Sequence, residues 1–248
     1  MALISRRLLR STSVFLSSQR GLHHPELGDA ASDHLSSLAH KAGVSRIAFL
    51  RHGNTAPKKV VDFDRVLTDL GRQQVQESAR SFGQQLLPLF PTVLVSPAPR
   101  TMETAQIFVR DELNQQHVSL QGIQALYDDT MQPEGSRLFQ KIGYAPLRDY
   151  WEDPSDGAVA REILGAYGVT FLETVCDRLS QLEEGSSSGG PTSALLFVGH
   201  AIYLPSAALV VAQAAGCDNL DVVWSTNTQE AEGYLVDLEH QTVSTLCR

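Results

Sequence analysis

The sequence has few cysteines, no long hydrophobic run and no acidic residue among its first 25 positions. Its three cysteines, Cys176, Cys217 and Cys247, are odd in number and far apart. A disulfide framework or a zinc site is therefore not expected, and a reducing compartment is the default. No apolar stretch approaches the roughly 20 residues that a membrane-spanning helix needs.

The first 25 residues contain four arginines and no acidic residue, with many serines and leucines. The arginines are Arg6, Arg7, Arg10 and Arg20. This composition is typical of an organelle transit peptide, because no continuous apolar core follows the basic start. We therefore expect residues 1–25 to direct the chain to an organelle, to a mitochondrion before a plastid. The alternative is a disordered tail on a cytoplasmic protein.

The remaining composition is that of an ordinary globular protein. The chain has 248 residues, of which 42% are hydrophobic and 19% charged, enough for one sizeable core. Setting the four arginines aside leaves 16 basic residues (20 minus 4) against 28 acidic ones, a balance of −12 (16 minus 28). So acidic a body argues against nucleic acid or a membrane surface as partner. The sequence does not determine the oligomeric state, and a homodimer is one of the options.

Strand-like and helix-like segments alternate along most of the chain, which predicts an α/β fold. We expect a three-layer αβα sandwich with a mostly parallel sheet, occupying residues 44–248 after a linker over 26–43. Strands are expected at 47–50, 92–96, 117–125, 194–198, 220–224 and 233–238. Helices are expected near 69–86, 100–114, 171–182 and 204–215.

Residues from about 126 to 163 interrupt this alternation with prolines, glycines and five aromatic residues. We interpret this segment as a small helical cap inserted over the strand ends. The alternative is an irregular surface connection with its own small apolar cluster.

Histidines and arginines follow three of the predicted strands. Arg51, His52 and Gly53 come directly after the apolar run 47–50, His200 follows the run 194–198, and Arg100 begins the helix after the strand 92–96. Ligands of open α/β sheets bind at the carboxyl ends of the strands. A helix N-terminus at Arg100 also favours an anion. The set therefore predicts an anion site suited to phosphate chemistry.

These residue types are sufficient for phosphoryl transfer. A neutral histidine can act as a nucleophile toward phosphorus, which divides one difficult displacement into two easier ones. Arginine is always charged and binds two phosphoryl oxygens at once. His52 as nucleophile, with Arg51, Arg100 and His200 around the phosphoryl group, needs no metal and no other cofactor. A carboxyl group must still protonate the leaving oxygen.

At this point the sequence resembles the histidine phosphatase superfamily, whose fold is phosphoglycerate mutase-like. Arg51-His52-Gly53 matches its signature, with Asn54-Thr55 in the next positions. The segments 64–71, 96–105 and 198–200 are similar to three further motifs in the same order, with Val66 in place of a proline. The resemblance implies that His52 carries the phosphoryl group and that Arg51, Asn54, Thr55, Arg100 and His200 bind it.

The resemblance implies a general acid less firmly. Asp128 lies where the family commonly has a glutamate, and Asp129 and Glu134 are its rivals. The short first loop is similar to that of the small phosphohistidine-phosphatase branch. The cap-sized insert, in contrast, is not typical of that branch.

We expect a phosphatase that acts on a small phosphorylated metabolite. A phosphoglycerate-type mutase, a phosphohistidine-protein phosphatase and a non-catalytic phospho-ligand-binding adaptor remain alternatives. The mutase is disfavoured because acidic residues balance the few basic ones in the cap.

Overall fold

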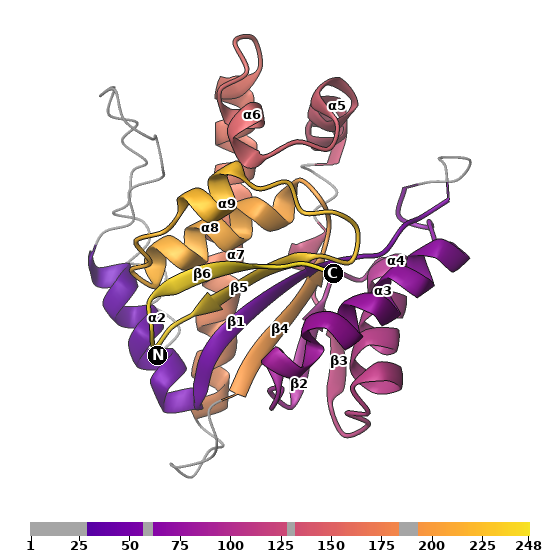
Figure 1. Ribbon diagram of the computed structural model, residues 1–248. Helices are drawn as coiled ribbons and strands as arrows, with labels where there is room; N and C mark the ends of the chain where they lie inside the picture. Colours follow the sequence, from indigo (N-terminus) through magenta and orange to yellow (C-terminus); the bar gives the residue numbers. More distant parts are fainter. Residues whose placement is uncertain (1–28, 57–61, 128–131, 184–192) are drawn as a thin grey trace.

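The computed structural model describes residues 29–56, 62–127, 132–183 and 193–248. A six-stranded sheet in the order β3-β2-β4-β1-β5-β6 forms its centre (Figure 1). The strands are β1 (Val44–Arg51), β2 (Thr92–Val95), β3 (Ser119–Gly122), β4 (Ser193–Gly199), β5 (Gly233–Asp237) and β6 (Thr242–Leu246). The first four strands run parallel, and β5 and β6 add an antiparallel hairpin at one edge.

Helices cover both faces of the sheet, which confirms the predicted α/β sandwich. One face carries α2 (Asp29–Ala42), α7 (Gly157–Glu183), α8 (Tyr203–Ala214) and α9 (Asp221–Ser225). The other carries α3 (Asp69–Phe82), η1 (Gly83–Leu86), α4 (Pro99–Ala105) and the π-helical segment η2 (Gln106–Glu112). Alternate residues of β1 face the two sides, because side chains of a strand point in opposite directions in turn. Ile47 and Phe49 enter the core under α7 and α8, and Ala48 and Leu50 enter the core under α3.

The segment that we interpreted as a cap contains two helices, α5 (Gln132–Ile142) and α6 (Leu147–Trp151), after the short turn η3 (Gln124–Leu126). Figure 1 shows α5 and α6 standing out from the body of the molecule. Their inner side is apolar: Leu138, Leu147 and Trp151 are buried, and the Trp151 ring meets the Trp224 ring edge to face at 5.3 Å. This part of the chain therefore has a packed connection to the core.

Two predicted boundaries need correction. Residues 29–42, expected to be part of a linker, form α2, and its residues Leu35, Leu38 and Ala39 are buried against the core. The folded part therefore begins before Val44. Residues 220–224, expected to be a strand, belong largely to the short helix α9, whose Trp224 packs on the cap. The strand β6 was not predicted.

Within the described ranges, no helix is long and apolar enough to cross a membrane. The transit peptide predicted over 1–25 lies outside those ranges.

Candidate active site

The parallel register of β1 and β4 brings the two histidines together. Arg51 is the register partner of Gly199, and the His52 amide donates to the Gly199 carbonyl at 3.1 Å. Each histidine follows immediately, so their rings lie edge to face with centroids 5.3 Å apart. The sequence predicted this meeting, and the structure confirms it: both side chains are buried at the carboxyl end of the sheet.

His52 is held as a neutral ring with a defined tautomer. Its Nδ1 lies 2.7 Å from the Gly53 carbonyl oxygen, which can only accept, so Nδ1 carries the proton. Nε2 then keeps its lone pair. Burial, followed by the charges of Arg51 and Arg100, lowers the pKa of His52 to about 3. The ring is therefore neutral, and one nitrogen can act as a nucleophile.

His200 has a different partner. Its Nε2 lies 2.7 Å from the Ser96 hydroxyl at the end of β2, so three strands meet at this pair. Its Nδ1 is buried and has no hydrogen-bond partner among the described residues. Burial and the nearby Arg100 lower the pKa of His200 well below 6.5.

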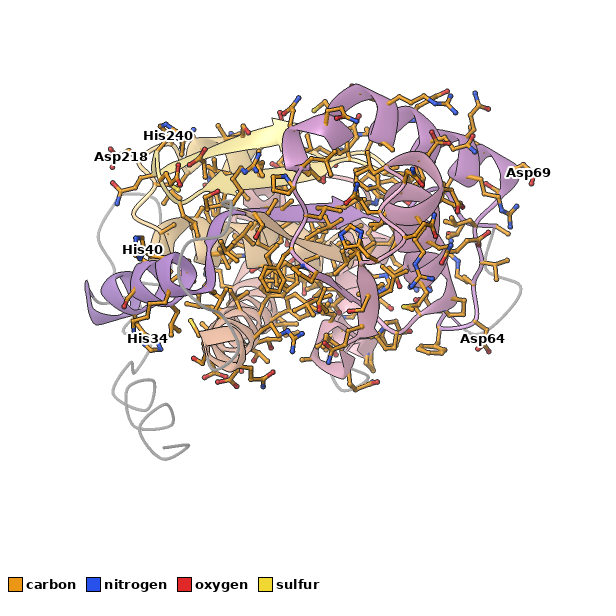
Figure 2. All side chains as sticks on the ribbon, turned by 90° about the horizontal axis from the view of Figure 1, so that it is seen from below. His34, His40, Asp64, Asp69, Asp218 and His240 are labelled. Atoms are coloured by element: carbon orange, nitrogen blue, oxygen red, sulfur yellow. The ribbon has the colours of Figure 1, made fainter. Side chains whose placement is uncertain are left out.

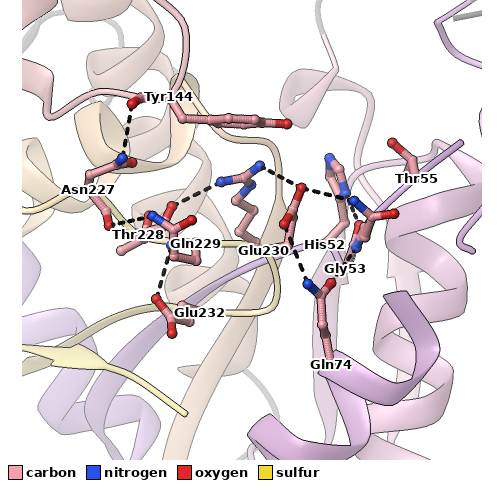
Figure 3. A network of polar contacts seen from close by, with 12 residues as sticks. His52, Gly53, Thr55, Gln74, Tyr144, Asn227, Thr228, Gln229, Glu230 and Glu232 are labelled. Carbon is pink, nitrogen blue, oxygen red and sulfur yellow. Dashed lines mark hydrogen bonds and ion pairs between the residues drawn. The ribbon is translucent and has the colours of Figure 1, made fainter. Parts of the chain in front are cut away.

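Arg51 is buried beside the histidines and has three kinds of neighbour. One terminal nitrogen donates to the Thr228 carbonyl at 2.9 Å, and the other lies 3.7 Å from Glu230. The Tyr144 ring covers the guanidinium at 4.4 Å. Figure 3 shows Tyr144, Thr228 and Glu230 around this position. Burial is the main cause that lowers the pKa of Arg51, and Glu230 acts against it.

Arg100 begins α4 and contacts a carboxylate that sequence reasoning did not single out. Its guanidinium donates to Asp62 Oδ2 at 2.9 Å and also contacts the Asp62 carbonyl. Arg65 donates to the other Asp62 oxygen at 3.2 Å and also contacts the Thr55 hydroxyl. Partial burial raises the pKa of Asp62, but Arg100 and Arg65 outweigh it, and the pKa is lowered. Arg65 is thus a third arginine near the predicted phosphate site.

Two glycines allow the first loop to lie directly against α3. A Cβ on Gly53 would be 2.5 Å from the Gly71 carbonyl oxygen, and a Cβ on Gly71 would be 2.2 Å from the Asn54 carbonyl oxygen. Only glycine fits at such an approach of two backbones. Thr68 caps α3 through the Gly71 amide and donates to the Asn54 side chain at 2.8 Å. The loop is therefore fixed on the helix that follows it.

Glu230 links several parts of the site and has no counterpart among the predicted residues. Its Oε1 accepts from the Asn54 amide side chain at 3.3 Å, and its Oε2 accepts from Gln74 at 3.5 Å. Gln74 in turn accepts from the Asn54 backbone amide at 2.8 Å. One partly exposed carboxylate thus joins Arg51, Asn54 and α3 (Figure 3). No local sequence pattern predicts this role, because Glu230 is far from these residues in the sequence.

The structure does not describe the position of the predicted general acid. Asp128 and its rival Asp129 lie outside the described residues. Glu134 is exposed on α5, where it pairs with Arg137 at 2.7 Å.

Two buried histidines and two buried arginines at the carboxyl end of a parallel sheet are typical of proteins that carry out chemistry on an anionic group. No three ligand-type side chains (His, Cys, Asp or Glu) gather into a metal-binding group in the part of the chain that the structure describes.

Comparison with known families identifies the class. The family model of the histidine phosphatase superfamily (branch 1) matches residues 47–219. The chain therefore belongs to the histidine phosphatase superfamily and is a histidine phosphatase-type enzyme. No curated protein matches the sequence.

Solved structures are similar to this chain at low sequence identity. Phosphoglycerate mutase from Bacillus anthracis is 11% identical with a TM-score of 0.50, over 80% of this chain and 90% of that one. Phosphoserine phosphatase from Entamoeba histolytica is 17% identical with a TM-score of 0.48, over 81% and 94%. The SixA protein from Agrobacterium tumefaciens is 16% identical with a TM-score of 0.48, over 78% and 92%.

Proposed function

We propose that this protein is a metal-independent phosphatase that hydrolyses a phosphate monoester of a small metabolite through a phosphohistidine on His52. The observation that carries the proposal is the state of His52: a neutral ring whose Nδ1 proton is engaged by Gly53, between two buried arginines. A free Nε2 lone pair beside fixed positive charge is what attack on a phosphoryl group requires.

The reaction has two displacements. The Nε2 lone pair of His52 attacks phosphorus, the bond from phosphorus to the ester oxygen breaks, and the leaving oxygen takes a proton from a carboxylic acid. Water then attacks the phosphohistidine and gives a proton to the carboxylate left by the first step, the phosphorus–nitrogen bond breaks, and phosphate leaves while Nε2 recovers its lone pair. Arg51, Arg100 and His200 bind the phosphoryl oxygens in both steps. Asp128 remains the proposed acid.

The charges of the cap favour a phosphatase over a mutase, which must retain a second phosphate. Each of its four basic residues already has a partner. Arg137 contacts Glu134 and Asp156, Lys141 contacts Asp153 and Asp156, Arg148 lies 3.6 Å from Asp149, and Arg161 donates to the Trp151 carbonyl. Each basic side chain in the described part of the cap would therefore have to leave a partner before it could bind a second phosphoryl group.

The decisive experiment measures phosphate release by the full chain from a panel of phosphate monoesters, in the presence of a chelator. The full chain is needed because a deletion through residue 43 would remove the buried face of α2. We expect His52→Ala to abolish turnover, and brief incubation of the unmodified protein with substrate to give an acid-labile, base-stable phosphoprotein.

His34→Ala is the matched control. His34 is an exposed residue of α2, at the opposite end of the molecule from Asp64 and Asp69, the chain neighbours of Arg65 and Thr68 (Figure 2). It should leave both turnover and phosphoprotein formation unchanged. Turnover that survives in His52→Ala would reject the proposal, and transfer of phosphate within the substrate without release would assign a mutase instead.

We also propose that residues 1–25 direct the chain to mitochondria. Their support is composition alone: four arginines and no acidic residue. A fluorescent protein fused to the C-terminus of the full chain should accumulate in mitochondria, and the same fusion with Arg6, Arg7, Arg10 and Arg20 replaced by serine should stay in the cytoplasm. Accumulation of the native fusion in plastids, or its retention in the cytoplasm, would refute the assignment.

A further inference from the structure

A pocket lies beside the histidines, between the cap and the body of the protein. Its empty space, including the open mouth, is about 320 Å³. Phe139, Tyr144 and Tyr150 of the cap segment line it, together with Ile202 and Asn227 from the body of the protein. It reaches the site at two points, Arg51 and Ala201, which follows His200 directly. A phosphoryl group held at His52 and His200 would therefore have this pocket next to it for the rest of the substrate.

The aromatic wall of this pocket is fixed from several directions. The Phe139 and Tyr144 rings meet edge to face with centroids 4.9 Å apart. Asn227 donates to the Tyr144 carbonyl at 3.0 Å, and the Tyr150 hydroxyl donates to the Gly143 carbonyl. Tyr144 nevertheless stays 54% exposed, so an incoming group can contact its ring. Aromatic contacts of this kind are favourable beyond the burial of area alone.

The pocket offers no partner for a second charge. Arg51 is the single charged side chain among the described residues that line it. Its terminal nitrogens contact Thr228 and Glu230, and its charge is assigned to the phosphoryl group in the mechanism proposed above. A carboxylate or an ammonium group on the substrate would lose water there without gaining an ion pair, which is unfavourable.

Resting on the phosphatase function proposed above, we infer that the leaving group of the substrate is an uncharged alcohol that carries an aromatic ring. The ring lies against Tyr144 and Phe139, and the phosphoryl group lies at His52. Phosphoglycerates and phosphoserine, whose leaving groups are charged, are disfavoured.

The test compares phosphate esters of primary alcohols that differ only in what the alcohol carries. Benzyl phosphate carries a ring, propyl phosphate an uncharged chain, phosphoglycolate a carboxylate and phosphoethanolamine an ammonium group. We expect kcat/KM for benzyl phosphate to exceed each of the others at least tenfold. This preference should persist in Tyr144→Phe and fall severalfold in Tyr144→Ala.

Binding separates a failure of this inference from a failure of the proposed function. Benzylphosphonate and phosphonoacetate cannot be hydrolysed, and calorimetry should show at least tenfold tighter binding of benzylphosphonate. Equal binding, or charged esters turned over as well as benzyl phosphate by a His52-dependent reaction, would overturn the inference. Selective binding of benzylphosphonate without any His52-dependent turnover would uphold the pocket assignment and reject the phosphatase.

Discussion

His52 makes stability sensitive to acid. Its pKa is about 3 in the folded protein against 6.5 in the unfolded chain. Between these values only the unfolded chain binds the proton, so the free energy of unfolding falls as the pH drops from 6.5 toward 3. From pH 7 to pH 5 this loss is about 2 kcal/mol.

Urea unfolding at pH 7 and pH 5 checks this expectation. His52→Asn removes the titrating group and keeps a nitrogen that can donate to Gly53. The variant should lose about 2 kcal/mol less than the wild type over this interval. An equal loss in both proteins would show that the His52 ring is accessible to protons in the folded state.

Glu230 affects the phosphate site through charge as well as through hydrogen bonds. Glu230→Gln keeps an oxygen for Asn54 but removes a negative charge next to Arg51, so inorganic phosphate should inhibit at about tenfold lower concentration, about 1.4 kcal/mol. Glu230→Ala also removes the acceptor for Asn54 and Gln74, and should lower kcat/KM. Product-inhibition constants measured at fixed ionic strength distinguish the two effects. Weaker phosphate inhibition in both variants would mean that the carboxylate is needed to orient Arg51.

The sequence predicted the four residues of the site that belong to motifs or follow strands. It could not predict Glu230, Asp62 or Tyr144, because each contacts the site only after distant segments fold together. Tyr144 reaches Arg51 from the cap, and Asp62 reaches Arg100 across the first loop. Neither contact depends on a local pattern of residues.

At the scale of elements, the strands under the site were predictable because each is a short, continuously apolar run, as expected for a strand buried on both faces. The helix α2 was not predicted, although Leu35, Leu38 and Ala42 have helical spacing. Its apolar stripe is narrow and its other residues are polar residues and alanines, so only its packing on α7 identifies it as part of the domain. Val222, Val223 and Trp224 favour a strand by type, yet all three lie within the helix α9.

The burial of α2 predicts its contribution to stability. Leu35 is completely buried, so Leu35→Ala should lower the free energy of unfolding by about 2–5 kcal/mol. Ser37→Ala on the exposed side of the same helix is the control and should change it by less than about 0.5 kcal/mol. Guanidinium denaturation of both variants measures the difference. A Leu35→Ala protein as stable as the control would contradict the packing of α2 on the core.

At the scale of the whole molecule, phosphate binding should stabilise the fold. Arg51 and Arg100 each have a buried Nε without a partner among the described residues, within a chain whose formal charge is −8. A ligand at a hundred times its dissociation constant adds about 2.7 kcal/mol, which raises the Tm by roughly 5–10 °C for a protein of this size. Thermal unfolding in phosphate and in chloride at equal ionic strength measures the shift. Arg100→Ala should reduce it, and an equal shift in that variant would assign the effect to another site.

The position of β1 in the sheet also governs when activity can arise during synthesis. This strand hydrogen-bonds to β4 on one side and β5 on the other, and these begin at residues 193 and 233. The nucleophile thus leaves the ribosome long before the strands that hold it. A nascent or truncated chain that lacks β5 is therefore expected to be inactive, because β1 then has no partner on that side.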